Sequence, residues 1–285
     1  SKDEYKYTPL HLACMKGYSD IVNMLIDKGA NIESKAEHEY TPLHIGCINE
    51  HLNIVKILTD KGANIESKDE HEYTPLHFTC INGNLDIFKI LINKGANIES
   101  KDENEYTPLH FACINGHFNI AIMLIDKGAN IKSKDENEHT PLHFAAENNY
   151  HDIVIYLIDK GANIDAKNYY GNTPLHLATD NDNFKIVKTL ISKKADVNIK
   201  NIDGITPLHM ASSRNNFKIV EILVEHEAHI NSLNNDNLKP INLTKNKKIN
   251  EYLSNAVKMM IDRKTYGCFW VMVYNHPSSG LKNKN

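Results

Sequence analysis

The tetrapeptide Thr-Pro-Leu-His occurs seven times in this chain, and successive copies are always 33 residues apart. The copies begin at Thr8, Thr41, Thr74, Thr107, Thr140, Thr173 and Thr206. A fixed period of this length is typical of a solenoid, in which each unit is one supersecondary element stacked on its neighbours. We therefore expect function to lie on a repeated surface, not in a single pocket.

The fourth unit illustrates the expected fold of one repeat. Thr107 suits a helix N-cap, and Pro108 suits the first helical position, where no backbone donor is needed. Gly116 ends this first helix, and a second helix with an apolar stripe runs from about Asn119 to Gly128. Neither helix is long enough to be stable alone, so each must bury its apolar face against the next unit.

Four of the five cysteines share one position of the repeat, six residues after the Thr. They are Cys14, Cys47, Cys80 and Cys113. Stacked helical units lie about 10 Å apart, whereas a disulfide needs Cα atoms within about 7 Å of each other. We therefore interpret these thiols as small buried side chains, which suits a reducing, intracellular compartment.

The repeated motifs resemble those of the ankyrin-repeat family over roughly residues 2 to 231. The resemblance rests on Thr-Pro-Leu-His, on second helices rich in Ile and Val, and on a repeated Gly-Ala-Asn-Ile. The last motif occupies residues 29–32, 62–65, 95–98, 128–131 and 161–164. The resemblance implies an all-α solenoid of paired antiparallel helices with projecting β-hairpin loops, in which the motif His braces neighbouring units. It also implies a role in protein–protein binding.

The loops depart from the family pattern, which has Gly two residues before the Thr. Only Gly171 and Gly204 keep it. The earlier units have Lys6, Glu39, Glu72, Glu105 and Glu138 at this position. Because a left-handed turn costs a non-Gly residue on the order of 1 kcal/mol, we expect the early hairpins to differ in shape from the late ones.

The array is expected to fill residues 1–264, as seven full units and a degenerate eighth unit that starts near residue 234. Residues 239–243 fall 33 residues after the seventh motif, and polar side chains on the last helix suit a terminal cap. Residues 265–285 contain an aromatic run and then a polar, disorder-prone end. A flap packed on the stack, a partner-docking segment and an exposed, aggregation-prone stretch stay open for the aromatic run.

The charge distribution argues against nucleic acid as a ligand. The net charge is −4, and residues from Lys245 onward carry eight basic against two acidic side chains, so the array before them is strongly acidic. Phosphate neutralisation supplies most of the affinity for nucleic acid, and an acidic body cannot provide it. No run of 18 apolar residues occurs, so no membrane span is expected. We expect a monomer with a protein partner.

No arrangement of residues predicts catalysis, a metal site or a cofactor. Seven of the sixteen His belong to the repeated tetrapeptide, and no second pair completes a zinc site with Cys113 and His117. No phosphate-binding loop, zinc-protease motif or nucleophile elbow is present. The carboxylates form repeated clusters, not one distinctive pair. We therefore predict that the chain is not an enzyme.

The predicted binding surface combines the hairpins with the inner ends of the first helices. Its members are Tyr7, Tyr40, Tyr73, Tyr106 and His139 before the Thr, Glu37, Glu70 and Glu103 at the tips, and Ile48, Ile81 and Ile114 on the helices. Aromatic anchors with an acidic rim suit a basic or extended segment of a partner. The alternative is that the Tyr rings only pack on neighbouring hairpins. A second candidate patch, where the repeat pattern breaks, contains Tyr169, Tyr170, Asp180, Ile202 and Arg214.

The predicted function is a non-catalytic protein-interaction scaffold in the cytoplasm or another reducing space. Two other interpretations stay open. The chain could be the regulatory or targeting array of a larger enzyme or channel, which its start partway through a repeat permits. It could also be a microbial effector that is secreted into a host cell.

Overall fold

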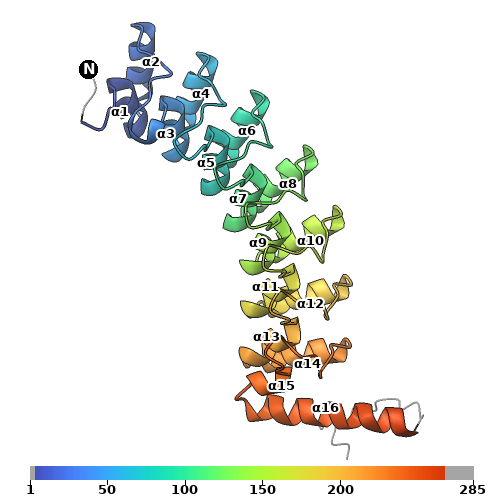
Figure 1. The fold of residues 1–285 in the computed structure, drawn as a ribbon. Helices are drawn as coiled ribbons and strands as arrows, with labels where there is room; N and C mark the ends of the chain where they lie inside the picture. The colour runs from blue at the N-terminus through green and yellow to red at the C-terminus, as the bar shows by residue number, and fades with distance from the viewer. Residues whose placement is uncertain (1–3, 267–285) are drawn as a thin grey trace, which may run out of the picture.

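The computed structural model describes residues 4–266, with side chains up to residue 257. Its helices are α1 (Pro9–Lys16), α2 (Ser19–Asp27), α3 (Pro42–Ile48), α4 (Leu52–Asp60), α5 (Pro75–Asn82), α6 (Leu85–Asn93), α7 (Pro108–Asn115), α8 (Phe118–Asp126), α9 (Pro141–Glu147), α10 (His151–Asp159), α11 (Pro174–Asp180), α12 (Phe184–Ser192), α13 (Pro207–Ser213), α14 (Phe217–Glu225), α15 (Pro240–Leu243) and α16 (Lys247–Tyr266). The first helices of the units are the odd-numbered ones from α1 to α13, and they line the inner side of one curved stack (Figure 1). The second helices are the even-numbered ones from α2 to α14, and they form the outer row. The expected all-α solenoid is confirmed.

The motif Thr caps each first helix. Thr107 is the N-cap of α7, Pro108 is the first helical residue, and the helix ends at Gly116 in the left-handed conformation with φ of 75°. His110 closes a capping box, because its Nδ1 accepts from the backbone N–H of Thr107 at 3.0 Å. The expected start and end of the first helix are therefore confirmed.

The same His connects each unit to the next. In the second unit, His44 Nδ1 accepts from the Thr41 N–H at 3.1 Å, so Nε2 carries the proton and donates to the carbonyl oxygen of Tyr73 at 3.1 Å. His11, His143, His176 and His209 make the equivalent bond to the carbonyls of Tyr40, Asn172, Ile205 and Leu238. Each motif His is fully buried. The bracing role implied by the family resemblance is thus confirmed.

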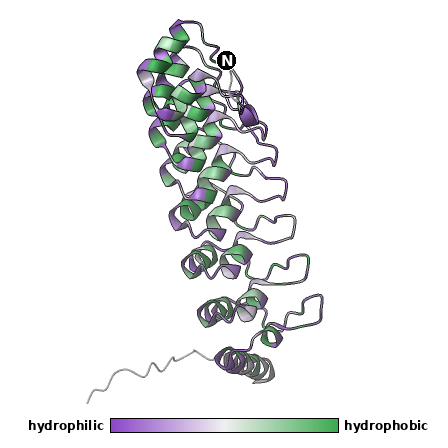
Figure 2. Cartoon of the chain, turned by 90° about the vertical axis from the view of Figure 1, so that its left-hand side faces the viewer, coloured by the Kyte–Doolittle hydropathy of each residue, from purple (hydrophilic) through white to green (hydrophobic). Residues whose placement is uncertain are grey.

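The core is one continuous apolar layer between the two rows of helices. In the third unit it contains Leu76 and Cys80 of α5 and Ile87 and Leu91 of α6, all with almost no solvent exposure. Figure 2 shows the apolar residues concentrated on the helices, while the loops that project from one side are mainly polar. The four cysteines of the repeat are buried free thiols, as predicted.

The projecting loops are hairpins in which no β-strand forms within residues 4–266. In the fourth unit, the Asp102 N–H donates to the Tyr106 carbonyl at 3.1 Å, and the Asp102 side chain accepts from the backbone N–H groups of Asn104 and Tyr106. Successive hairpins are joined by one backbone hydrogen bond, such as that from Glu103 N–H to the His71 carbonyl at 3.1 Å. The loops therefore form a continuous ladder along the stack.

The hairpins of units three to five keep the left-handed turn without Gly, so the expected difference in shape between early and late hairpins is wrong for these units. Glu72, Glu105 and Glu138 have φ of 63°, 66° and 60°, close to the 73° of Gly171 and Gly204. Each of these Glu side chains pairs with the Lys four residues earlier, as Glu72 does with Lys68 at 2.7 Å. The cross-loop ion pair offsets part of the cost of the left-handed backbone, although an exposed pair contributes only up to about 1 kcal/mol.

The second unit has a distorted hairpin with an identifiable cause. Ala36 stands where the other hairpins have Asp or Asn, so no side chain accepts the backbone N–H groups of the turn. Glu37–Glu39 form a single 3₁₀ turn, and both His38 and Glu39 have positive φ. The loss of one side-chain acceptor thus changes the local shape.

The described part of the array ends in a helix pair whose first helix is shortened and whose second helix is extended. α15 has only four residues, and α16 is a single helix of 20 residues that crosses the end of the stack (Figure 1). Ile249 and Leu253 of α16 are fully buried against the preceding unit. The prediction for residues 265–285 falls almost entirely outside the described residues. Within residues 4–266, no helix combines the length and apolarity that a membrane crossing needs.

Candidate functional site

Aromatic rings form a continuous row along the inner side of the stack. Tyr73 packs against Phe78 of its own unit and Phe111 of the next, with ring centroids 5.6 and 5.5 Å apart. Similar contacts join seven rings in space, and the distance between the centroids of neighbouring rings is always between 5.1 and 5.9 Å. In order of contact, the rings are those of Tyr40, Phe78, Tyr73, Phe111, Tyr106, Phe144 and His139. We call these seven residues the aromatic row. The four predicted anchors Tyr40, Tyr73, Tyr106 and His139 are therefore brought together, and all are half-buried.

The tyrosine hydroxyls face carboxylates of the following hairpin. Burial and the Asp102 carboxylate raise the pKa of Tyr73 to about 12. Asp102 itself is buried, its pKa is raised by desolvation, and its Oδ2 makes no hydrogen bond of standard geometry; the Tyr73 hydroxyl is close enough to interact with it. Tyr106 and Asp135 form the next such pair, and burial with the Asp135 carboxylate raises the Tyr106 pKa.

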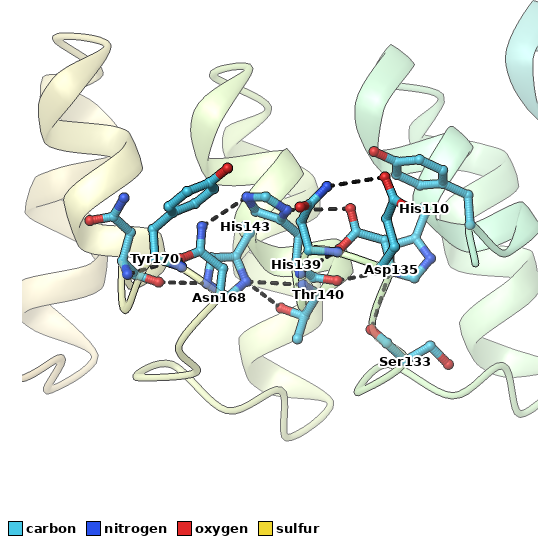
Figure 3. Close-up of polar contacts among 12 residues, drawn as sticks. His110, Ser133, Asp135, His139, Thr140, His143, Asn168 and Tyr170 are labelled. Atoms are coloured by element: carbon cyan, nitrogen blue, oxygen red, sulfur yellow. Dashed lines mark hydrogen bonds and ion pairs between the residues drawn. The ribbon is translucent and has the colours of Figure 1, made fainter. Parts of the chain in front are cut away.

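The fifth unit shows the same connection with different residues. His139 lies between Asp135 and Asn168 (Figure 3). Its Nδ1 is 3.3 Å from Asp135 Oδ2, and Nδ2 of Asn168 is 2.8 Å from its Nε2. In the following unit, Asn201 Nδ2 donates to Asn172 Oδ1 at 3.0 Å. The residue before the Thr is thus fixed by the next hairpin in each of these units.

The predicted tip acids are exposed and lie beside histidines. Glu70 pairs with His38 of the preceding hairpin, and Glu103 Oε1 is 2.8 Å from His71 Nδ1. The Glu103 carboxylate is the main cause that raises the His71 pKa. Glu37 is exposed at the second hairpin, and its backbone N–H donates to the Tyr5 carbonyl at 2.9 Å. These acids form a row parallel to the aromatic row.

The remaining predicted residues occupy two places. Ile48, Ile81 and Ile114 are half-buried at the ends of α3, α5 and α7, and Tyr7 is half-buried beside His11 at the start of the array. Tyr169 and Tyr170 are exposed at the sixth hairpin.

Arg214 makes an ion pair that limits its availability as a contact residue. Its guanidinium donates to both carboxylate oxygens of Asp180 at 2.8 and 2.9 Å. Both residues belong to the second predicted patch, and their charges neutralise each other there.

The site offers surfaces for contact, and its polar groups are mostly engaged in holding the stack together. In the part of the chain that the structure describes, no three His, Cys, Asp or Glu side chains are grouped as a metal would require. Burial lowers the pKa of His77 and His110 to about 4, so these motif imidazoles are neutral and engaged in hydrogen bonds.

Comparison with known proteins fits this architecture. The family model described as ankyrin repeats (3 copies) matches residues 1–69, 66–135 and 130–201, and the one described as ankyrin repeats (many copies) matches residues 190–243. The chain belongs to the ankyrin-repeat family. Ankyrin repeats are generally protein-interaction modules and are typically non-catalytic.

A solved structure supports the same fold for this ankyrin array. The crystal structure of the human ASB11 ankyrin repeat domain is 26% identical, covers 78% of this chain and 99% of its own, and superposes with a TM-score of 0.71. A search of curated proteins found no match.

Sequence reasoning missed the phenylalanines that complete the aromatic row. Phe78, Phe111 and Phe144 follow directly after the motif His of their units, so their period of 33 residues was visible. Their position next to the tyrosines of two different units depends on how the units stack, which the period alone does not specify.

Proposed function

We propose that this ankyrin array is a protein-interaction scaffold that binds an extended, basic segment of a partner between its hairpins and its inner helices. The aromatic row supports this proposal most directly. Its three Tyr rings and His139 are half-exposed and pack on Phe78, Phe111 and Phe144, of which the last two are buried. These contacts hold the exposed rings in place, so the rings lose little conformational entropy when a partner covers them.

The charge of the hairpins favours a basic segment as the ligand. The hairpins at residues 35–40, 68–73, 101–106 and 134–139 carry eleven carboxylates and four lysines. Each lysine pairs with a Glu of its own hairpin, which leaves an excess of negative charge along the tips. An acidic rim beside aromatic anchors attracts lysine and arginine side chains, both by charge and over the ring faces.

The buried, reduced thiols of the repeat favour a reducing space such as the cytoplasm, and we propose that the array acts there as a monomer. All four thiols are buried, and burial raises the pKa of Cys14 to about 12, so they are poorly suited to disulfide chemistry. Gel filtration with light scattering tests the monomer directly.

The decisive experiment is partner capture with variants of the two rows. Affinity capture from a lysate with mass spectrometry would compare the wild type with Tyr40→Ser/Tyr73→Ser/Tyr106→Ser and with Glu37→Gln/Glu70→Gln/Glu103→Gln. The glutamates are exposed, so the second variant should keep its fold. We expect both variants to lose the proteins that the wild type retains.

A charge-matched control separates this surface from general electrostatics. Asp20, Asp86 and Asp152 are exposed on α2, α6 and α10, away from the hairpins. Their triple Asn variant removes the same charge and should capture the same proteins as the wild type. Unchanged capture by the glutamate variant, with circular dichroism showing that it is folded, would contradict the proposal.

A further inference from the structure

The hairpin tips change character at one point along the stack. The fourth residue before each Thr is Glu37, Glu70, Glu103 and Glu136 in units two to five, and then Tyr169 and Ile202 in units six and seven. The hairpins at residues 167–172 and 200–205 together carry two lysines and one Asp, so the acidic excess of the earlier hairpins is gone. One edge of the molecule is therefore divided into an acidic stretch and an apolar stretch.

The apolar stretch is a cluster of exposed side chains. Tyr169, Tyr170 and Ile202 are 65%, 48% and 57% exposed, the highest values among the large apolar residues of the sixth and seventh hairpins. The two tyrosine rings are in contact edge to face, with centroids 5.4 Å apart, and the Ile202 N–H donates to the Tyr170 carbonyl at 3.0 Å. We call these three residues the apolar tip patch.

The backbone holds the apolar tip patch in place. Gly171 has φ of 73°, and a Cβ atom there would lie 3.0 Å from the Ile202 nitrogen, so glycine lets the two hairpins approach closely. Asn168 and Asn201 each accept two backbone N–H groups of their own hairpin through Oδ1. Large apolar side chains presented on a fixed backbone are typical of interaction hot spots.

The apolar character continues inward from the tips. Ile205 and Met210 are half-exposed and line a surface depression beside the seventh hairpin, together with the Asp180–Arg214 ion pair. The ion pair neutralises the charges of Asp180 and Arg214, which leaves Asp236 as the other acidic residue that lines the depression. Ile205 belongs to the same hairpin as Ile202, so apolar surface continues from the apolar tip patch toward the depression.

We propose that the array binds a bipartite linear segment, in which a bulky apolar anchor occupies the apolar tip patch and basic residues follow along the acidic tips. Successive units are about 10 Å apart, and an extended chain advances about 3.3 Å per residue. One unit therefore corresponds to about three ligand residues. The Lys or Arg side chains that meet Glu136, Glu103 and Glu70 stand about three, six and nine residues from the anchor. This inference rests on the proposed function and adds the spacing between the apolar anchor of the ligand and its basic residues.

Synthetic peptides test the register without a known partner. The probes are fluorescein-labelled peptides with a Trp-Leu anchor and three lysines in a Gly/Ser background, made with the anchor at either end. In one peptide the lysines are placed at every third residue, and in the matched control they are grouped together at the end distant from the anchor. Two further peptides have only the anchor or only the spaced lysines.

We expect the spaced, anchored peptide to bind most tightly in fluorescence anisotropy. It should exceed the clustered control and each half-peptide by at least about tenfold, because both parts of the surface are then engaged at once. Equal affinity of the spaced and clustered peptides in both orientations, or no binding by any peptide, would overturn the proposal.

Variants assign the two parts of the ligand to the two parts of the surface. Tyr169→Ser/Tyr170→Ser/Ile202→Ser should weaken the anchored peptide at least about tenfold and leave the lysine-only peptide unchanged. Glu70→Gln/Glu103→Gln/Glu136→Gln should reduce the salt dependence of binding of the spaced, anchored peptide and leave the anchor-only peptide unchanged. The control for exposed apolar residues is Leu52→Ser/Phe118→Ser/Phe184→Ser, at the starts of α4, α8 and α12.

The two proposals fail in different ways. In one case, the Tyr40/Tyr73/Tyr106 variant loses partner capture, but the Tyr169/Tyr170/Ile202 variant binds the peptides as the wild type does. This result would support the scaffold and refute the bipartite segment. If the control variant weakens the anchored peptide as much as the patch variant does, the patch is not the anchor site.

Discussion

Asn168 and His139 belong to successive hairpins, and the Asn168 Nδ2 lies 2.8 Å from the His139 Nε2. Two units earlier, Tyr73 occupies the position of His139 and Asp102 occupies the position of Asn168. There the Tyr73 hydroxyl interacts with the Asp102 carboxylate. In both cases a side chain of the inner surface is fixed by a polar group of the next hairpin. The surface that could contact a partner is thus built from the same interactions that hold neighbouring units together.

Removal of the Tyr73 hydroxyl should destabilise the array. Tyr73→Phe keeps the ring contacts but leaves the buried Asp102 Oδ2 without its polar neighbour, which costs about 1–3 kcal/mol. Tyr170→Phe is the matched control, because Tyr170 is largely exposed, and its effect should be within about 0.5 kcal/mol. Urea denaturation followed by circular dichroism measures both. Equal free energies of unfolding for the two variants would show that the Tyr73–Asp102 contact is not stabilising.

Equivalent isoleucines should differ in their contribution to stability according to their unit. Ile21 is 41% exposed on α2, whereas Ile87, at the same repeat position on α6, is fully buried against the preceding unit. Ile87→Ala should lower the free energy of unfolding by about 2–5 kcal/mol, and Ile21→Ala by less than about 1 kcal/mol.

The same pair can be tested with a charged residue. Ile87→Lys should prevent folding of the third unit, whereas Ile21→Lys should be tolerated because its side chain can reach water. Thermal unfolding by calorimetry compares the four variants. A large loss of stability in the Ile21 variants would mean that another part of the molecule covers this face.

Exchange of residues at the left-handed hairpin position should have opposite effects in early and late units. Glu105→Gly relieves a φ of 66° and loses only an exposed ion pair with Lys101, so it should be neutral or stabilising by up to about 1 kcal/mol. Gly171→Ala introduces a Cβ atom 3.0 Å from the Ile202 nitrogen and should cost about 1 kcal/mol or more. Denaturation midpoints check the signs; a destabilised Glu105→Gly would mean that the ion pair outweighs the backbone strain.

The motif histidines should make the fold sensitive to acid. Burial lowers the pKa of five of them from 6.5 to about 4; they are His44, His77, His110, His143 and His176. Between these two pH values the unfolded chain binds protons that the folded chain does not. The free energy of unfolding is therefore highest above pH 6.5 and falls as the pH decreases toward 4.

Substitution of one histidine isolates its share of this acid effect. Near pH 5, the five histidines should add about four protons to the uptake on unfolding, since each is largely protonated only in the unfolded state, whereas buried carboxyls with a raised pKa, such as Asp102, subtract from that uptake. Urea denaturation between pH 5 and 7.5 measures the slope, and His143→Gln should reduce it by about one proton. An unchanged slope in His143→Gln would contradict the neutral, hydrogen-bonded state of this imidazole.

The sequence by itself determined the units and their local structure. Thr107 and Pro108 start a helix and Gly116 ends it through local geometry, because cap bonds and left-handed turns involve residues a few positions apart. The same local reasoning failed for Glu72, Glu105 and Glu138, whose hairpins were expected to differ in shape from those with Gly. Hydrogen bonds within each hairpin and an ion pair across it hold the left-handed turn.

Only the tertiary structure decided which residues of different units meet. The aromatic row needs Tyr73 to lie between Phe78 and Phe111, and the neutralisation of Arg214 needs Asp180 to lie one unit away. A period of 33 residues specifies that such residues recur, but their contacts depend on the distance and rotation between units. Those quantities come from how the buried side chains of neighbouring helices pack, and this packing is a property of the whole stack.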